Sequence, residues 1–201
     1  VIVKIVPIEH GLTLAAPAEG YVRSPGLHMS QLYGSLFEGL EPERFGSQDG
    51  GPDPLKLELG LALEEGLEQS LKDRFKALRP GERKTKDGTN IIYTPDMLFS
   101  EKGYTVVGEI KLSWMSSREV PREPAQAFPS KFNKWIVQVQ AYCYHLPTRY
   151  ARLFVYFVNG SYDRRNHSGP ELLSWSFEFT QKELNSTWQM LVNNAKHVGL
   201  L

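Results

Sequence analysis

The stretch that decides the fold runs from residue 90 to residue 114 and reads NIIYTPDMLFSEKGYTVVGEIKLSW. Two apolar segments, residues 90–99 and 104–114, flank a short polar stretch that ends in Gly103. Strand-forming residues on both sides of such a turn predict an antiparallel β-hairpin. Acidic and basic side chains interrupt both strands, which is unusual for elements that form a core.

These charged side chains lie at defined positions on the two strands. Asp96 follows Pro95 in the first strand, whereas Glu109 and Lys111 stand two residues apart in the second and therefore project from the same face. An ionised carboxylate on a buried face is costly unless it is paired or binds a metal. Carboxylate oxygens suit Mg²⁺ or Mn²⁺, and a neighbouring lysine can neutralise a developing anion or help to activate a metal-bound water.

A helix predicted over residues 55–78 carries another carboxylate on its apolar side. Leucine and phenylalanine recur there at helical spacing, at Leu57, Leu61, Leu71 and Phe75. Glu64 falls within this apolar stripe, Glu68 lies near its edge, and Glu65 points away from it. Glu64 either binds a metal with the hairpin acids, or it snorkels to solvent or pairs with a buried arginine.

A second helix, predicted over residues 131–146, has a polar stripe beside its apolar one. The polar stripe consists of Lys131, Lys134, Gln138, Tyr142 and His145. Cations, an amide and a phenol in one line suit a phosphate backbone, although an ordinary amphipathic helix would also place lysines outside. Arg118 and Arg122, in the loop before this helix, could approach the same backbone.

The remaining elements complete an α/β domain in which a central β-sheet is flanked by helices. We expect strands at residues 1–8, 152–158 and 173–179, a helix over residues 30–40 capped by Ser30, a loop over residues 41–54, and a last helix over residues 181–197. Thr180 and Glu183 form a capping-box pattern at the start of that last helix.

Composition limits the possible functions. The chain has 201 residues, enough for a single domain spanning residues 1–201, and its 23 basic and 23 acidic residues exclude a polycationic protein. The single cysteine, Cys143, excludes a disulfide framework, a four-cysteine zinc site and an iron–sulfur cluster. Because no apolar run is long enough to span a membrane and no signal-peptide pattern is present, we expect a soluble, cytoplasmic protein with no membrane partner.

Three motifs together resemble the PD-(D/E)XK nuclease superfamily, in its RecB-like and lambda-type phage exonuclease branch. TPDM and GEIK, with twelve residues between Asp96 and Glu109, resemble its bipartite signature. GLALEEGLE, residues 60–68, is similar to the G-x-x-x-(H/E) motif, with Glu64 at the acidic position. QVQAY, residues 138–142, matches the Q-x-x-x-Y motif. The three motifs occur in family order.

This resemblance implies a restriction-endonuclease-like core over about residues 55–180 and the hydrolysis of DNA phosphodiester bonds. It assigns metal ligation, by Mg²⁺ or substituting Mn²⁺, to the side chains of Glu64, Asp96 and Glu109 and to the backbone carbonyl of Ile110. Lys111, Gln138 and Tyr142 would assist catalysis, and Lys131, Lys134, Arg118 and Arg122 would bind DNA.

The branch also favours a 5′-to-3′ exonuclease for recombination or DNA processing, working in the cytoplasm (the host cytoplasm if the protein is phage-encoded). A single-strand annealing or other recombination protein is a candidate partner, and a homo-oligomer is compatible with the branch.

The sequence departs from many RecB-like members, which have histidine at the position of Glu64 and cysteines for an iron–sulfur cluster. Glu68 could share the role of Glu64. Three alternatives stay open: a structure-selective endonuclease similar to junction resolvases, a non-catalytic nucleic-acid-binding module, and an unrelated protein whose buried acids form structural ion pairs.

Overall fold

The structure is a computed structural model that describes residues 23–46, 54–120, 128–159 and 170–201. The predicted strand at residues 1–8 and the candidate DNA-binding residue Arg122 lie outside these ranges. Among the helices in the described ranges, none is long and apolar enough to cross a membrane.

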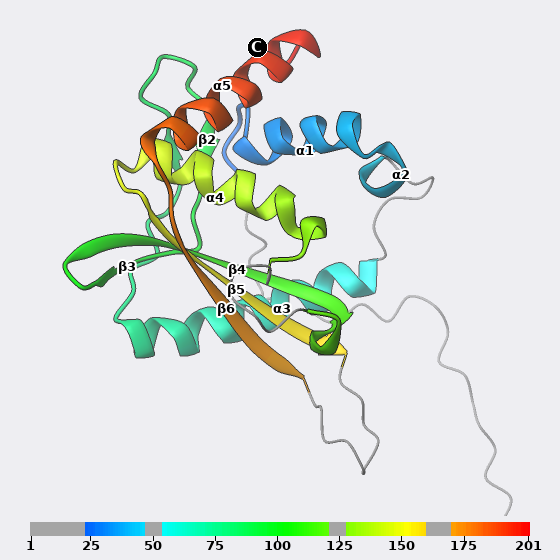
Figure 1. Cartoon of the computed structure of the whole chain (residues 1–201), viewed down its shortest axis with the longest axis vertical. Helices are drawn as coiled ribbons and strands as arrows, with labels where there is room; N and C mark the ends of the chain where they lie inside the picture. The colour runs from blue at the N-terminus through cyan, green and yellow to red at the C-terminus, as the bar shows by residue number, and fades with distance from the viewer. Residues whose placement is uncertain (1–22, 47–53, 121–127, 160–169) are drawn as a thin grey trace, which may run out of the picture.

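A four-stranded mixed sheet forms the centre of the molecule (Figure 1). Its strands are β3 (Met97–Glu101), β4 (Tyr104–Ser116), β5 (Tyr150–Asn159) and β6 (Glu171–Glu178), in the spatial order β3-β4-β5-β6. β4 and β5 run parallel, whereas the two outer pairs are antiparallel. The antiparallel pairing of β3 with β4 confirms the predicted hairpin, and Gly103 in its turn has the positive φ of 82° that glycine adopts without strain.

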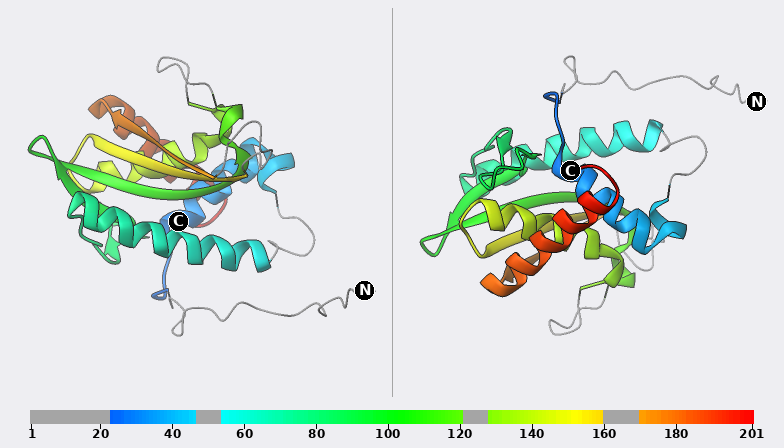
Figure 2. Two further views of the ribbon diagram at one scale, coloured as in Figure 1. Left: turned by 90° about the horizontal axis from the view of Figure 1, so that it is seen from below. Right: turned by 90° about the horizontal axis from the view of Figure 1, so that it is seen from above.

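Helices cover both faces of the sheet, as the two views in Figure 2 show. α3 (Pro54–Phe75) lies on one face, and α1 (Met29–Leu40), α4 (Asn133–His145) and α5 (Gln181–His197) lie on the other. Alternating residues of β4 divide between these layers: Val106 and Ile110 pack toward α3, and Val107 packs toward α1 and α4. The expected α/β fold with a helix-flanked sheet is therefore confirmed.

Several short elements were not expected from the sequence. α2 (Pro42–Phe45) lies within the predicted loop, and 3₁₀ turns span Ser117–Glu119 (η1) and Ser130–Phe132 (η2). The segment predicted as one strand over residues 90–99 is divided: β2 (Ile92–Tyr93) pairs with β1 (Arg83–Lys84) in a separate sheet, and β3 begins only at Met97. Pro95 lies in the break between them, where it needs no backbone N–H for a ladder bond.

Two predicted helix ends were wrong. The N-cap of α1 is His28 and not Ser30. The backbone N–H of His28 donates a hydrogen bond to the side chain of Gln31, at 2.8 Å. α3 ends at Phe75 rather than residue 78, since Lys76 adopts a φ of 50°. In contrast, the predicted capping box of α5, formed by Thr180 and Glu183, is confirmed.

Because β3 is short, the part of β4 that carries the charged residues has no strand partner on that side. β3 pairs with β4 only from Glu101 to Met97, whose partner is Gly108. Beyond Gly108, the described residues provide no further strand on this edge of β4. The carboxylate of Asp96 instead accepts a hydrogen bond from the backbone N–H of Ile110, at 2.7 Å. The end of β3 therefore places Asp96 directly beside Glu109 and Lys111.

Candidate active site

Residues from six parts of the chain line a cavity of about 290 Å³ at this edge of β4. The predicted site residues among them are Glu64 from α3, Asp96 before β3, Glu109 and Lys111 from β4, and Gln138 and Tyr142 from α4. The structure thus brings together all six side chains that the sequence predicted as catalytic. They are separated by up to 78 positions in the sequence, so the fold alone makes them neighbours.

Glu109 is the most deeply buried acid of the cavity, with 1% of its surface exposed. Its Oε1 accepts a hydrogen bond from Lys111 Nζ, at 2.5 Å, and a second from Gln138 Nε2. Gln138 also donates to the hydroxyl of Tyr142, at 3.0 Å. The other oxygen of Glu109, Oε2, is buried and has no hydrogen-bond partner among the described residues. A buried carboxylate oxygen without a partner is costly, and a bound cation would satisfy it.

Three acids of α3, Glu64, Glu65 and Glu68, have separate environments. Glu64 lines the cavity, whereas Glu65 is exposed to solvent. Glu68 is buried, and its carboxylate pairs with Lys72 at 2.8 Å and with Arg79 at 3.5 Å. Glu68 does not line the cavity, and its carboxylate already has two cationic partners. The structure therefore favours Glu64 as the metal ligand and Glu68 as a positioning residue.

The carboxylates of the cavity raise one another's pKa. Burial, the negative charge of Asp96 and that of Glu68 raise the pKa of Glu64 to about 7, against the opposing charge of Lys111. Burial and Asp96 likewise raise the pKa of Glu109 to about 8, and burial raises that of Asp96. Burial disfavours the charge on Lys111, but the carboxylates of Glu109 and Asp96 outweigh it and raise its pKa. All three carboxyl groups are therefore harder to ionise than in water, whereas Lys111 keeps its positive charge.

The donor set is compatible with a hard divalent cation in its chemistry, since it consists of carboxylate oxygens. As the side chains lie, however, no three His, Cys, Asp or Glu residues within the described ranges are grouped closely enough to hold an ion. The ammonium of Lys111 contacts Glu109 directly and is the cation nearest to it. Ile110, whose carbonyl was a predicted ligand, is held in place through its N–H by Asp96.

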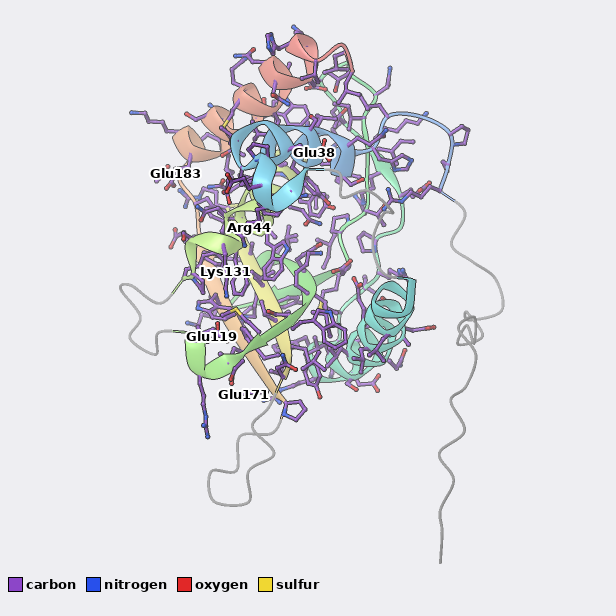
Figure 3. The ribbon with its side chains drawn as sticks, turned by 90° about the vertical axis from the view of Figure 1, so that its right-hand side faces the viewer. Glu38, Arg44, Glu119, Lys131, Glu171 and Glu183 are labelled. Carbon is purple, nitrogen blue, oxygen red and sulfur yellow. The ribbon has the colours of Figure 1, made fainter. Side chains whose placement is uncertain are left out.

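The predicted DNA-binding residues within the described ranges, Lys131, Lys134 and Arg118, do not line this cavity. Lys131 and Lys134 stand at the start of the α4 region, and Lys131 forms an ion pair with Glu119 at 3.8 Å (Figure 3). Arg118 is exposed in η1. His145, the last member of the predicted polar stripe, is buried against the rings of Tyr93 and Trp188 rather than facing the cavity.

Sequence reasoning missed several residues that line the cavity, notably Arg23, Tyr33, Arg79 and Thr94. Arg23 donates a hydrogen bond to Ser30 at 3.1 Å, so Ser30 faces the cavity instead of capping α1. Nothing in the local pattern distinguishes Arg79 from other basic residues near it.

Comparison with known proteins gives one result, at the level of the fold. No family model and no curated protein matches the sequence. Among solved structures, the alkaline exonuclease LHK-Exo from Laribacter hongkongensis, in complex with dAMP, is similar over 87% of this chain and 88% of its own, with a TM-score of 0.54 and 12% sequence identity. This chain has the fold of that exonuclease.

A second structure of LHK-Exo agrees, with a TM-score of 0.52 and 11% identity over 85% of this chain and 79% of that one. The expected fold, a central mixed sheet flanked by helices, is thereby confirmed. At these identities the likeness concerns the arrangement of helices and strands, and the roles of individual residues rest on the cavity itself.

Proposed function

We propose that this protein is a metal-dependent deoxyribonuclease that hydrolyses phosphodiester bonds, acting as an exonuclease. One observation carries the proposal: Glu64, Asp96, Glu109 and Lys111, from three separate elements, line one cavity within the fold of an alkaline exonuclease. A non-catalytic binding module would gain nothing from a buried Glu109 beside the half-buried Glu64 and Asp96, an arrangement that raises the pKa of all three acids.

The side chains around the cavity have different roles in the proposed reaction. Lys111 lies 2.5 Å from Glu109, so its ammonium can stabilise the negative charge that develops on the phosphate during hydrolysis. Gln138 holds Glu109 in position by a hydrogen bond. The guanidinium groups of Arg23 and Arg79 can bind phosphate oxygens at the cavity.

Glu64, Asp96 and Glu109 would hold Mg²⁺, for which Mn²⁺ can substitute, and the free oxygen of Glu109 supports this assignment. When bound, the ion supplies Lewis-acid polarisation of the phosphate and a lowered pKa for the attacking water. The lining pairs these three carboxylates with three cationic side chains, Lys111, Arg23 and Arg79, so the Lewis-acid chemistry depends on the bound ion and not on the charge of the cavity. We therefore expect the protein to have no nuclease activity in EDTA.

The test is a gel assay with end-labelled linear duplex, closed circular DNA and single strands, each with Mg²⁺ and with EDTA. We expect Mg²⁺-dependent degradation of linear DNA from its ends and intact closed circles. Cleavage of closed circles would replace the exonuclease with an endonuclease. Undiminished activity of a folded Lys111→Met variant would contradict the assignment of the cavity as the active site.

A role in recombination or DNA processing, a single-strand annealing protein as partner, and assembly into a homo-oligomer follow from the family resemblance and stay predictions. The backbone carbonyl of Ile110 as a ligand and Arg118 as a DNA contact are predictions of the same kind.

A further inference from the structure

Glu68 is a buried carboxylate that pairs with a residue of the active-site cavity without lining the cavity itself. It lies one helical turn after Glu64 on α3, so the two side chains project from the same face of the helix. Only 6% of Glu68 is exposed, and an ionised carboxylate at this depth is costly without counter-charges. Lys72 and Arg79 supply them: Lys72 Nζ lies 2.8 Å from Oε1, and Arg79 Nη1 lies 3.5 Å from Oε2.

The two cations that pair with Glu68 lie in different places. Lys72 is in the last turn of α3 and does not line the cavity. Arg79 lines the cavity together with Glu64 and Asp96. Burial raises the pKa of both of these acids, and the positive charge of Arg79 opposes the rise in each. One carboxylate between two cations leaves a surplus positive charge, and Arg79 is the member of the group that presents it to the cavity.

The backbone fixes the point from which the Arg79 side chain starts. After α3 the chain turns at Lys76, whose φ is 50°, and runs back beside β3 (Figure 1). Leu78 exchanges two backbone hydrogen bonds of 2.8 Å with Leu98 of β3. Because Leu98 is two positions after Asp96, this pairing holds residue 79 next to the segment that carries an acid of the cavity. The contact with Glu68 then holds the guanidinium.

The guanidinium of Arg79 has donors left for a ligand. Its N–H groups form a planar fork, and the ion pair with Glu68 is made through Nη1. The side chain of Arg79 is 55% exposed, so solvent reaches it although its partner is buried. Such a guanidinium can bind an anion through its remaining donors, and a phosphate fits the fork in a bidentate way. In a nuclease, the anion that enters this cavity is a phosphate of the DNA backbone.

We infer that Glu68 is a positioning residue that holds Arg79 at the cavity, where the guanidinium binds a backbone phosphate of DNA, and this inference rests on the nuclease function proposed above. Arg79 contacts the substrate, and Glu68 acts only through Arg79. A long side chain loses conformational entropy when it is immobilised on a ligand. The buried carboxylate restrains the guanidinium beforehand and so reduces that loss.

The experiment measures DNA binding rather than cleavage. A labelled, blunt-ended duplex oligonucleotide is titrated into the full chain in EDTA at several salt concentrations. Arg79→Gln removes the proposed phosphate contact, whereas Arg79→Lys retains the charge without the planar fork. Lys72→Gln is the matched control, because it removes the other cation that pairs with Glu68, which lies outside the cavity.

We expect Arg79→Gln to weaken duplex binding about 3- to 10-fold at about 0.1 M salt and to lower the slope of log affinity against log salt by about 0.9. Arg79→Lys should restore the slope and part of the affinity. Lys72→Gln should leave the slope unchanged and the affinity within about twofold of the unmodified protein, because Lys72 contacts no phosphate.

Glu68→Gln separates positioning from simple electrostatics by the sign of its effect. The substitution removes a negative charge, so electrostatics alone would strengthen binding to DNA, whereas loss of the positioning contact weakens it. We expect Glu68→Gln to weaken binding about 2- to 5-fold, and to weaken it no further when Arg79 is already replaced by glutamine. Glu68→Asp, which keeps the charge but shortens the side chain by one methylene, repeats the test if Glu68→Gln does not fold.

Equal affinities and equal salt slopes for Arg79→Gln and Lys72→Gln would overturn the inference, as would tighter binding by Glu68→Gln or an unmodified protein that binds no duplex. Weaker binding on replacing Glu68 in the Arg79→Gln background would also contradict it, because Glu68 would then act by another route. These measurements need no metal and no turnover, so they are independent of the gel assay. A protein that binds duplex through Arg79 but cleaves nothing would refute the proposed nuclease and leave the role of Glu68 standing.

Discussion

The amide of Gln138 on α4 donates a hydrogen bond to the carboxylate of Glu109 on β4, 29 residues earlier in the chain. Both side chains are buried, with 4% and 1% of their surfaces exposed. This contact connects the helix that carries the Q-x-x-x-Y pattern to the strand that carries the E-x-K pattern. The glutamine of one pattern is therefore the hydrogen-bond partner of the glutamate of the other.

Replacing Gln138 by methionine should lower the cleavage rate about 10- to 100-fold, because Glu109 loses the group that orients it. Gln140→Met is the matched control: Gln140 also lies on α4 and accepts a hydrogen bond, from Thr187 on α5 at 2.8 Å, away from the cavity. The control should lose about 1 kcal/mol of stability and keep its activity. Equal rates for the two variants would show that Gln138 has a structural role only.

Adding Mg²⁺ should stabilise the folded protein, because the ion relieves the repulsion among the carboxylates of the cavity. At a hundredfold excess over Kd, we expect Tm to rise by about 5–10 °C. Asp96→Asn should abolish this rise, whereas Asp73→Asn, which changes an exposed acid of α3, should retain it. The measurement is a thermal melt monitored by circular dichroism, with and without Mg²⁺. A Tm of the unmodified protein that is insensitive to Mg²⁺ would argue against the metal site.

Acid should destabilise the protein through His145. Burial lowers the pKa of His145 to about 4, although the charge of Asp87 opposes the shift, whereas an unfolded histidine titrates near 6.5. Between these values the unfolded chain binds the additional proton, so the free energy of unfolding falls as pH decreases from about 6.5 to 4, by roughly 3 kcal/mol, and this contribution is constant above 6.5. In urea titrations across this range, His145→Phe should show a shallower pH dependence. An unchanged slope would mean that His145 is protonated in the fold.

Gly108 fixes the register of the hairpin next to the site. A Cβ at this position would lie 2.3 Å from Met97 Cγ, and Met97 is fully buried. Gly108→Ala should therefore destabilise the protein by about 1–3 kcal/mol in chemical denaturation. Gly66→Ala, in the interior of α3 with nothing within 4 Å of the added carbon, should instead stabilise it by about 0.5–1 kcal/mol. Loss of stability in both variants would indicate that close packing at Gly108 is not the cause.

Periodicity and chemistry predicted the parts of this fold that depend on local pattern. The hairpin followed from two apolar runs around Gly103, and Glu109 and Lys111 share a face because strand residues alternate. Glu64 could be distinguished from Glu65 because one position of the helix points inward and the next does not. Because these two periodicities are local, they predicted the helices and strands that carry the site, apart from their ends and the break at Pro95.

The parts that failed depend on contacts between distant segments. Ser30 looked like a helix cap, but Arg23 holds its hydroxyl at the cavity and His28 caps the helix. Leu78 looked like the end of an apolar stripe, but the backbone turns at Lys76 and leaves Leu78 largely exposed beside β3.

The central claim is that the inward acid of α3 takes part in metal-dependent hydrolysis of DNA. The most direct measurement compares Glu64→Gln with Glu65→Gln, two equal changes at adjacent positions, of which only the first lines the cavity. Nucleotide release from linear duplex DNA is followed with saturating Mg²⁺. We predict that Glu64→Gln loses at least about a hundredfold in rate while Glu65→Gln stays within about twofold of the unmodified protein. A folded Glu64→Gln variant that degrades DNA at the unmodified rate would contradict the account.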